Sequence, residues 1–313
     1  MRRAFIFPGQ GSQSVGMGRD LWRTFAAARE VFEAVDEALG EKLSTIIFDG
    51  PDEDLRLTRN AQPALMAMSM AVIRVIESES GQKITALADA VAGHSLGEYS
   101  ALTAAGALSL QDAARLLRLR GDAMQAAVPV GEGAMAALLG ADLAVAGEIA
   151  MAAADGDICT LANDNAPGQI VLSGAKAAIG RAVAMAGQRG VKKAILLPVS
   201  APFHCALMTP AAEIMARALR TTDMARPAMP LFANVTARAV RDPGEIRGLL
   251  KRQVTAMVRW RECVLAMRAD GVELLVEAGA GKVLKTLTRR IDRDLEAVSV
   301  GGVEEIENFL HTL

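Results

Sequence analysis

The sequence predicts an α/β protein that combines a parallel, doubly wound sheet with a small inserted domain. Two observations support this fold class. Short apolar runs alternate with stretches of helical periodicity towards both ends of the chain, which is typical of a parallel sheet. The middle instead follows the order strand, helix, strand, strand, helix, strand, which is the ferredoxin-like arrangement. We therefore expect 127–197 to be an inserted domain, while 1–126 and 198–313 form the large domain.

The first part of the chain contains two short buried strands and the helices that follow them. Strands are expected over 4–7 and 88–92, and helices over roughly 62–77 and 96–105. Apolar residues at helical spacing predict one further helix that ends at Gly40, and they are Leu21, Phe25, Phe32, Val35 and Leu39. Ser109 with Asp112 is typical of the capped start of another helix.

Pro129 and three glycines between 131 and 140 mark the boundary of the inserted domain. Inside it, strands are expected over 134–139, 158–162, 169–173 and 192–197, helices over 142–154 and 176–188, and a turn at Pro167-Gly168. From Pro198 the pattern of the large domain resumes, with strands near 231–235, 272–277 and 297–300.

Composition indicates a globular, intracellular protein. Hydrophobic residues make up 51% of the 313 residues, charged residues 22%, and the net charge is −2. A weak net charge without long runs of one sign argues against nucleic acid or an anionic membrane as the main partner. Three widely spaced cysteines fit neither a disulfide framework nor a zinc site, and no apolar stretch has the length of a membrane span. We expect a cytoplasmic monomer.

Gly93-His94-Ser95-Leu96-Gly97 is a GxSxG sequence between an expected strand and an expected helix. A tight strand–turn–helix forces the serine into a strained conformation, and small flanking residues avoid a clash. The N–H groups that follow lie at a helix N-terminus, where they can bind an oxyanion. The motif also arises by chance, and Ser95 could merely cap the next helix. Its context favours an exposed nucleophile at the carboxyl end of a central strand.

A serine nucleophile needs a base, and the chain has only three histidines, His94, His204 and His311. His204 follows the apolar run 194–197 and a short loop, so it lies near the carboxyl end of a strand, where open α/β sheets place their sites. His94 adjoins the serine and is expected to point away from it, and His311 lies on a terminal helix that would fray. A locally bonded loop histidine remains the alternative for His204.

Arg120 falls within an apolar stripe of the helix that Ser109 begins, whereas Arg115 and Arg118 turn away from that stripe. A guanidinium on an apolar face costs free energy unless it meets an anion. That anion could be a substrate carboxylate or an internal acidic side chain, and spacing alone does not decide between them.

Two glycine-containing segments resemble phosphate loops without completing the pattern. They are Gly9-Gln10-Gly11 and Gly279-Ala280-Gly281-Lys282, and position 283 is Val where a P-loop needs Ser or Thr. We interpret both as backbone turns that line the cleft, not as nucleotide sites.

Six segments together resemble malonyl-CoA:acyl carrier protein transacylases over essentially the whole chain. They are FPGQGSQ (7–13), AQPAL (61–65), GHSLGEYSAL (93–102), RLRG (118–121), SAPFHCALM (200–208) and GAGKVL (279–284). The family's fold is an α/β-hydrolase-like large domain with a ferredoxin-like insert. Its activity would make malonyl-CoA and acyl carrier protein the partners, and it requires no metal or redox cofactor. One departure is Lys285-Thr286, where the family usually has Thr-Gly.

The resemblance also implies roles for individual residues. It makes Ser95 the nucleophile and His204 its base, with the main-chain carbonyl of Gln253 orienting the imidazole. Gln10 and Leu96 would supply the N–H groups of the oxyanion hole, and Arg120 would bind the malonyl carboxylate. Phe203 stands where malonyl-selective members carry Phe and members with larger substrates carry Ser.

Two other functions remain in contention from the sequence. A serine esterase or thioesterase would need an aspartate between Ser95 and a late histidine such as His311, although more than a hundred residues with strand signals follow His204. A non-catalytic scaffold or synthase subunit would show no acylation of the serine.

Overall fold

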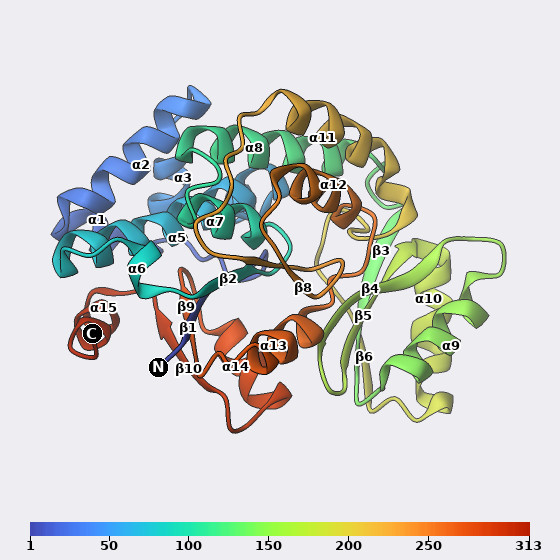
Figure 1. The fold of residues 1–313 in the computed structure, drawn as a ribbon. Coiled ribbons are helices and arrows are strands. Elements are labelled where there is room, and N and C mark those ends of the chain that lie inside the picture. Colours follow the sequence, from blue (N-terminus) through green and yellow to red (C-terminus); the bar gives the residue numbers. More distant parts are fainter.

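A six-stranded sheet crosses the larger part of the molecule in this computed structural model, which describes residues 1–313 (Figure 1). The strand order is β10-β9-β1-β2-β7-β8, and only β8 runs antiparallel to its neighbour. The strands are β1 (Arg3–Phe7), β2 (Ala90–Gly93), β7 (Leu231–Ala233), β8 (Arg238–Val240), β9 (Leu274–Ala278) and β10 (Glu296–Val300). The parallel strands confirm the sequence prediction, whereas β8 was not anticipated.

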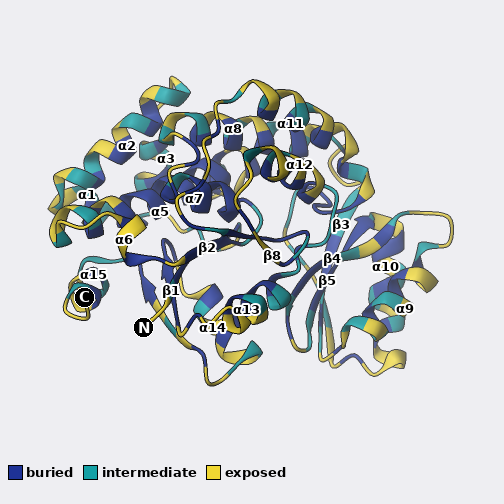
Figure 2. Cartoon of the chain, in the orientation of Figure 1, coloured by how far each residue is buried: buried dark blue, intermediate teal, exposed yellow.

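Both faces of this sheet are covered, as a parallel sheet requires. On β1, Phe5 and Phe7 belong to one apolar core, while Ala4 and Ile6 belong to a second core on the opposite face. All four side chains are buried, and Figure 2 shows β2 and most of β1 in the colour of buried residues. The strand that precedes the GxSxG motif is therefore held rigidly from two sides.

Thirteen helices accompany the large sheet. They are α1 (Arg19–Thr24), α2 (Ala26–Leu39), α3 (Leu43–Asp49), α4 (Asp52–Arg56), α5 (Thr58–Ser80), α6 (Ile84–Leu87), α7 (Gly97–Ala104), α8 (Leu110–Ala126), α11 (Thr209–Thr221), α12 (Pro243–Gln253), α13 (Trp260–Ala269), α14 (Val283–Ile291) and α15 (Val303–Leu310). None of them is long and apolar enough to cross a membrane.

The single helix predicted up to Gly40 is in fact two helices. Phe25 has an extended backbone (φ −116°, ψ 128°), which ends α1 and starts α2. The guanidinium of Arg29 donates to the carbonyl oxygens of Trp22 (3.0 Å) and Arg23 (3.3 Å) at the end of α1. Apolar spacing does not reveal such a side-chain cap, because the two helices present their apolar residues to the same core. The predicted cap of α8 is confirmed: Ser109 accepts a hydrogen bond from the Asp112 N–H.

A second, four-stranded sheet is antiparallel throughout and has the order β4-β5-β3-β6. It comprises β3 (Gly133–Leu139), β4 (Cys159–Ala166), β5 (Gln169–Ala175) and β6 (Lys193–Leu196), with α9 (Leu143–Ala154), α10 (Lys176–Ala186) and the 3₁₀ turn η1 (Gly187–Arg189). A further 3₁₀ turn, η2 (Ala206–Met208), lies where the chain has returned to the large sheet. The two helices pack on one face, and Figure 1 places this unit beside the large sheet. Each predicted element of this segment is present in the predicted order.

Strand β4 runs four residues beyond its predicted end at residue 162, because its last part contacts the large unit. The Val258 N–H donates to the Ala162 carbonyl and the Asp164 N–H donates to the Val258 carbonyl, both at 2.9 Å. The buried carboxylate of Asp164 also pairs with the Arg261 guanidinium at 2.8 Å. These contacts join the small sheet to α13 and the segment before it in the large unit.

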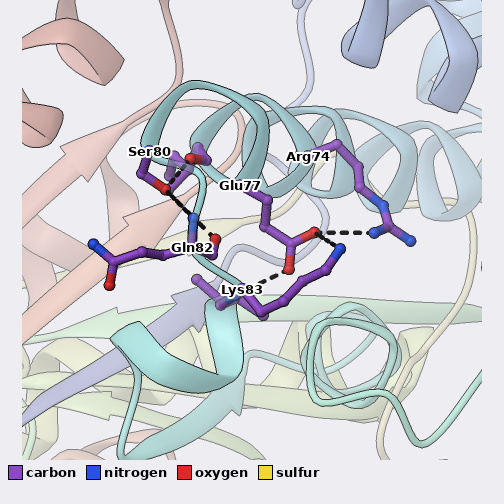
Figure 3. Close-up of polar contacts among 7 residues, drawn as sticks. Arg74, Glu77, Ser80, Gln82 and Lys83 are labelled. Atoms are coloured by element: carbon purple, nitrogen blue, oxygen red, sulfur yellow. Dashed lines mark hydrogen bonds and ion pairs between the residues drawn. The ribbon is translucent and has the colours of Figure 1, made fainter.

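The connection from α5 to β2 is fixed by the carboxylate of Glu77 (Figure 3). It pairs with Arg74 (3.0 Å) and Lys83 (3.4 Å) and accepts a hydrogen bond from the Ile84 N–H (2.9 Å). The Ser80 hydroxyl meanwhile donates to the Ile76 carbonyl in the last turn of α5. Glu77 thereby holds the start of α6, from which the chain enters β2.

We predict that Arg261→Ala destabilises the protein, because it leaves the buried Asp164 carboxylate without its cation. Breaking a fully buried pair costs about 3–5 kcal/mol, and partial exposure of Arg261 reduces the expected loss to about 2–3 kcal/mol. Unfolding in urea measures this loss as a change in the free energy of unfolding. The control is Arg189→Ala, which removes an exposed pair with Glu148 and should leave stability unchanged within error. Equal midpoints for the two variants would show that the Asp164 pair does not join the sheets energetically.

Candidate active site

The GxSxG segment forms a turn that only small residues allow. A Cβ atom added to Gly93 would lie 1.9 Å from the carbonyl carbon of Gly97, and one added to Gly97 would lie 2.3 Å from the Phe7 carbonyl oxygen. Between them Ser95 has a φ of 53°, which is rare for a residue with a side chain. The turn places Ser95 at the carboxyl end of β2 and immediately before α7, as predicted. Its side chain is half-buried, not fully exposed as expected.

Ser95 and His204 are in hydrogen-bond contact. The distance from the Ser95 Oγ to the His204 Nε2 is 2.8 Å, and the His204 Nδ1 lies 2.8 Å from the main-chain oxygen of Gln253. A carbonyl oxygen only accepts, so Nδ1 carries the hydrogen and Nε2 presents its lone pair to the serine hydroxyl. The pair therefore has the geometry of a nucleophile and its base, without an acidic third member.

The environment of His204 keeps the imidazole neutral. Burial lowers its pKa to about 3, and the positive charge of Arg120 acts in the same direction, while the hydrogen bond to Gln253 opposes the shift. His204 is also one of four non-glycine residues with positive φ, at 60°. Such backbone strain is typically held at functional sites by the surrounding structure.

Arg120 is fully buried, and no carboxylate lies within ion-pair distance of it. Its Nη1 donates to the Gln62 Oε1 (2.7 Å), and its Nη2 donates to the Gln253 Oε1 (3.0 Å) and the Ser95 Oγ (3.1 Å). The internal ion pair that the sequence left open is therefore absent. Neighbouring Arg115 and Arg118, by contrast, pair with Asp112 and Glu41. No carboxylate contacts the cation of Arg120, and the carboxyl group of Glu98 acts on it only at longer range.

Two backbone N–H groups beside the serine have no acceptor within the protein. They belong to Gln10, in the loop after β1, and to Leu96, directly after Ser95. The Gln10 side chain is fixed separately, because its Oε1 accepts from the Thr58 hydroxyl at 2.6 Å. Free donors at this position can bind an oxygen that becomes negative during reaction.

A cavity of about 410 Å³ opens beside these groups, between the two sheets. The large unit contributes Ser95, His204, Arg120 and Phe203, and the small sheet contributes mainly Met135, Asn163, Asn165 and Val171. Only 7 of the 19 lining residues are hydrophobic, and most of the others carry polar side chains that converge on the cavity, which suits a polar small molecule. The Gln10 loop lines this cavity as expected.

The loop Gly279–Lys282 does not line the cavity, contrary to the prediction. It follows β9, which is separated from β2 by β1, so it lies too far along the sheet edge. Its Lys282 pairs instead with Glu305 at 2.8 Å. No group of three or more His, Cys, Asp or Glu side chains is arranged to hold a metal ion.

The other two histidines do not contact Ser95. The Nε2 of His94 lies 2.8 Å from the Asn165 Oδ1, so His94 turns away from the serine hydroxyl as expected, although it lines the same cavity. His311 follows α15 at the far end of the molecule and is exposed.

Sequence reasoning missed three buried polar residues that support the site. Gln62 accepts from Arg120, while Glu98 and Asn234 lie behind the serine turn. Burial raises the pKa of Glu98 to about 8, opposed by hydrogen bonds from Asn234 and Gln253 and by the charge of Arg120. Asn234 follows β7, the neighbour of β2, and its Oδ1 accepts from the Ser95 N–H at 2.9 Å. The end of a neighbouring parallel strand was the one signal that could have identified Asn234.

Comparison with known proteins agrees with this geometry. The family model described as "Acyl transferase domain" matches residues 4–304. The malonyl CoA-acyl carrier protein transacylase of Bacillus subtilis (strain 168) is 45% identical over 311 residues, which cover 99% of this chain and 96% of the relative. The protein of the same name from Escherichia coli (strain K12) is 45% identical over 94% of both chains.

Solved structures are equally similar. The acyl-carrier-protein-S-malonyltransferase of Bartonella henselae superposes with a TM-score of 0.97 at 57% identity, covering 100% of this chain and 99% of the other. A structure described as a type II PKS acyl-carrier protein in complex with its malonyl-transacylase has a TM-score of 0.96 at 39% identity, with both chains covered completely.

The low pKa of His204 predicts a flat pH profile for the reactivity of Ser95 between pH 7 and 5. A base acts in its neutral form, which persists down to its pKa; an ordinary imidazole of pKa ~6.5 would be only ~3% neutral at pH 5. The carboxyl group of Glu98 has a pKa of about 8, so it does not change its protonation state between pH 7 and 5. The measurement is the rate at which an uncharged, serine-reactive phosphonate labels Ser95. Arg120→Gln removes the cation that lowers the pKa of His204, so the labelling rate of this variant should begin to fall at a higher pH than in the wild type. A wild-type rate that halves near pH 6.5 would contradict the prediction.

Proposed function

The chain belongs to the acyl transferase domain family, and we propose that it transfers the malonyl group from malonyl-CoA to the phosphopantetheine thiol of an acyl carrier protein. The observation that carries the proposal is Arg120, a buried guanidinium 3.1 Å from the Ser95 hydroxyl and without an anion of its own. A substrate with a free carboxylate close to its reacting carbonyl would supply that anion. Malonyl thioesters have this shape.

In the first half-reaction the Ser95 Oγ attacks the thioester carbonyl while its proton moves to the His204 Nε2. The carbonyl oxygen becomes negative and is bound by the N–H groups of Gln10 and Leu96. The carbon–sulfur bond then breaks, and coenzyme A leaves as a thiol with the proton from His204. The product is a malonyl ester of Ser95.

The second half-reaction runs the same steps in reverse order. The carrier-protein thiol gives its proton to His204, and its sulfur attacks the ester carbonyl. When the tetrahedral intermediate collapses, Ser95 takes the proton back. One thioester replaces another, so the reaction needs no external energy source and should follow ping-pong kinetics.

Specificity is assigned to two side chains that line the cavity. Arg120 binds the carboxylate through two parallel hydrogen bonds from Nη2 and Nε. Nη2 exchanges its bonds to Gln253 and Ser95 for this contact, and Nε has no other partner. Phe203 is almost fully buried against the cavity, where it would exclude branched acyl groups larger than malonyl. The Gln253 carbonyl accepts from the His204 Nδ1 and so holds the imidazole ring in the same orientation during both half-reactions.

A serine hydrolase is not favoured. That reading needs an aspartate behind the catalytic histidine and would use His311, yet a main-chain carbonyl accepts from the His204 Nδ1, and His311 is exposed after α15. The relatives named above are transacylases and malonyltransferases.

The proposal extends to the architecture. We assign 1–126 and 198–313 to an α/β-hydrolase-like catalytic domain and 127–197 to a ferredoxin-like inserted subdomain. The separate core of the small sheet and its strand order β4-β5-β3-β6 support the division. Three free, buried cysteines support a reducing, cytoplasmic location.

Malonyl-CoA alone should convert the wild-type protein into a stable malonyl-enzyme. Intact mass spectrometry would show one added malonyl group, and peptide mapping would place it on Ser95. Ser95→Ala should fold normally and remain unmodified, because loss of a nucleophile costs ~10⁶-fold in one well-studied serine enzyme. Steady release of free malonate by the wild type would indicate the hydrolase, and labelling at another residue would overturn the role of Ser95.

Arg120 should discriminate between malonyl and acetyl thioesters. Removing one member of a desolvated charge pair costs about 2–5 kcal/mol, so Arg120→Ala should lower kcat/KM for malonyl-CoA roughly 30- to several thousand-fold. Acetyl-CoA has no carboxylate and should lose nothing or gain. Arg120→Lys is the matched control, which keeps the charge but not the planar fork, and should restore malonyl transfer only in part. Equal losses for both thioesters would assign Arg120 a structural role.

A further inference from the structure

We propose that Glu98 is a positioning residue of the transferase site, whose buried carboxylate holds Asn234 and Gln253 so that they fix Ser95 and His204. The inference rests on the proposed function for its reaction, and on the hydrogen bonds behind the site for its geometry. Glu98 does not line the cavity and touches no reacting atom.

Glu98 is the second residue of α7 and lies behind the serine turn. Only 1% of it is exposed. Its Oε1 accepts from the Asn234 N–H at 2.5 Å, and its Oε2 accepts from the Gln253 Nε2 at 2.6 Å. No Lys, Arg or His forms an ion pair with it, so these two short bonds are its direct partners.

Asn234 connects this carboxylate to the nucleophile. Its Oδ1 accepts from the Ser95 N–H at 2.9 Å, and its Nδ2 donates to the Gly93 carbonyl at 2.8 Å. The two bonds span the turn in which Ser95 holds its positive φ. Because Glu98 fixes the backbone of Asn234, it helps to hold the strained turn in place.

Gln253 connects the same carboxylate to the base and to the guanidinium. Its side-chain Nε2 also donates to the Ser95 carbonyl at 2.9 Å, and its Oε1 accepts from Arg120. Its main-chain oxygen accepts from the His204 Nδ1. The Glu98 carboxylate is thus connected to Ser95 through Asn234. It is connected to His204 and Arg120 through Gln253.

The chemistry of the two partners calls for a carboxylate at this position. The Asn234 N–H can only donate, and the orientation of the Gln253 amide is fixed by Arg120 on one side and by the Ser95 carbonyl on the other. Both groups therefore offer hydrogens to Glu98. Glutamine at position 98 would turn its own NH₂ group towards one of these donors, and an unsatisfied buried donor would displace Asn234 or Gln253.

Glu277, in strand β9 of the large sheet, offers a matched control. It is also fully buried, and its two oxygens accept from the N–H groups of Leu284 (2.9 Å) and Lys285 (2.8 Å) at the start of α14. It has no contact with the cavity. Glu277→Gln loses the same kind of hydrogen bond without touching the site.

The test is the labelling of Ser95 by an uncharged fluorophosphonate at pH 8.5, above the pKa of Glu98. Glu98→Gln should lower the maximal labelling rate about 10- to 100-fold, the range found when groups that orient a metal ligand are removed. The half-saturating concentration should not change, because Glu98 does not touch the reagent. Glu277→Gln should label at the wild-type rate even if its melting temperature falls. A Glu98→Gln rate within twofold of wild type, or an equal loss in Glu277→Gln, would overturn the proposal.

A second variant covers the case in which Glu98→Gln does not fold. Gln253→Met keeps the main-chain carbonyl and removes the amide, so it breaks the connection from its other end. It should slow labelling similarly, and where both single variants fold, the double variant should lose little more than either, because the residues act as one unit. A wild-type rate in Gln253→Met would contradict the proposal.

The phosphonate has no carboxylate, so the outcome separates the two proposals. A wild-type protein that takes the phosphonate on Ser95 but accepts no malonyl group would overturn the proposed function. The role of Glu98 would then still be decided by the labelling rates of Glu98→Gln and Glu277→Gln. A wild-type protein that is not labelled on Ser95 would overturn both.

Discussion

The buried guanidinium of Arg120 is the constraint on which the rest of the site depends. A permanent charge out of water needs acceptors. The Nη1 and Nη2 atoms find them in the side chains of Gln62, Gln253 and Ser95, while Nε has no partner. All three are neutral, so the positive charge remains available to a ligand. The same charge depresses the basicity of His204. When a carboxylate binds Arg120, it compensates this charge, so the base strengthens at the moment the substrate arrives.

Backbone strain at the site is held by polar contacts that lie outside the cavity. Ser95 and His204 both have positive φ, which for such residues costs about 1–3 kcal/mol each. Asn234, Gln253 and Glu98 form the layer behind them, and β1 and β2 are packed from both faces. The reacting atoms are thus positioned before a substrate enters, and reorganisation during the reaction is small.

Much of this arrangement was predictable from sequence, and what was missed has a physical reason. The GxSxG turn between a strand and a helix located Ser95, and the scarcity of histidines located His204. Arg120 was found because a charge within an apolar stripe needs an explanation, but its partners Gln62 and Gln253 come from helices 58 and 133 residues away in sequence. The break at Phe25, the long end of β4 and the roles of Glu98 and Asn234 depend on tertiary contacts, which local periodicity does not record.

The face of the small sheet that is covered by α9 and α10 has a core of its own. Its other face joins the cores of the large unit through Met135, Ala162, Val171 and Ala166. The last residues of β4 also contact Val258, Arg261 and His94. Ser95, His204 and Arg120 all come from the large unit, as does most of the cavity lining, and the small sheet completes the wall. One part of the chamber wall is therefore encoded in a different stretch of the gene from Ser95, His204 and Arg120. Sequence drift in β3 and β5 can remodel the acyl chamber while the chemistry is inherited unaltered.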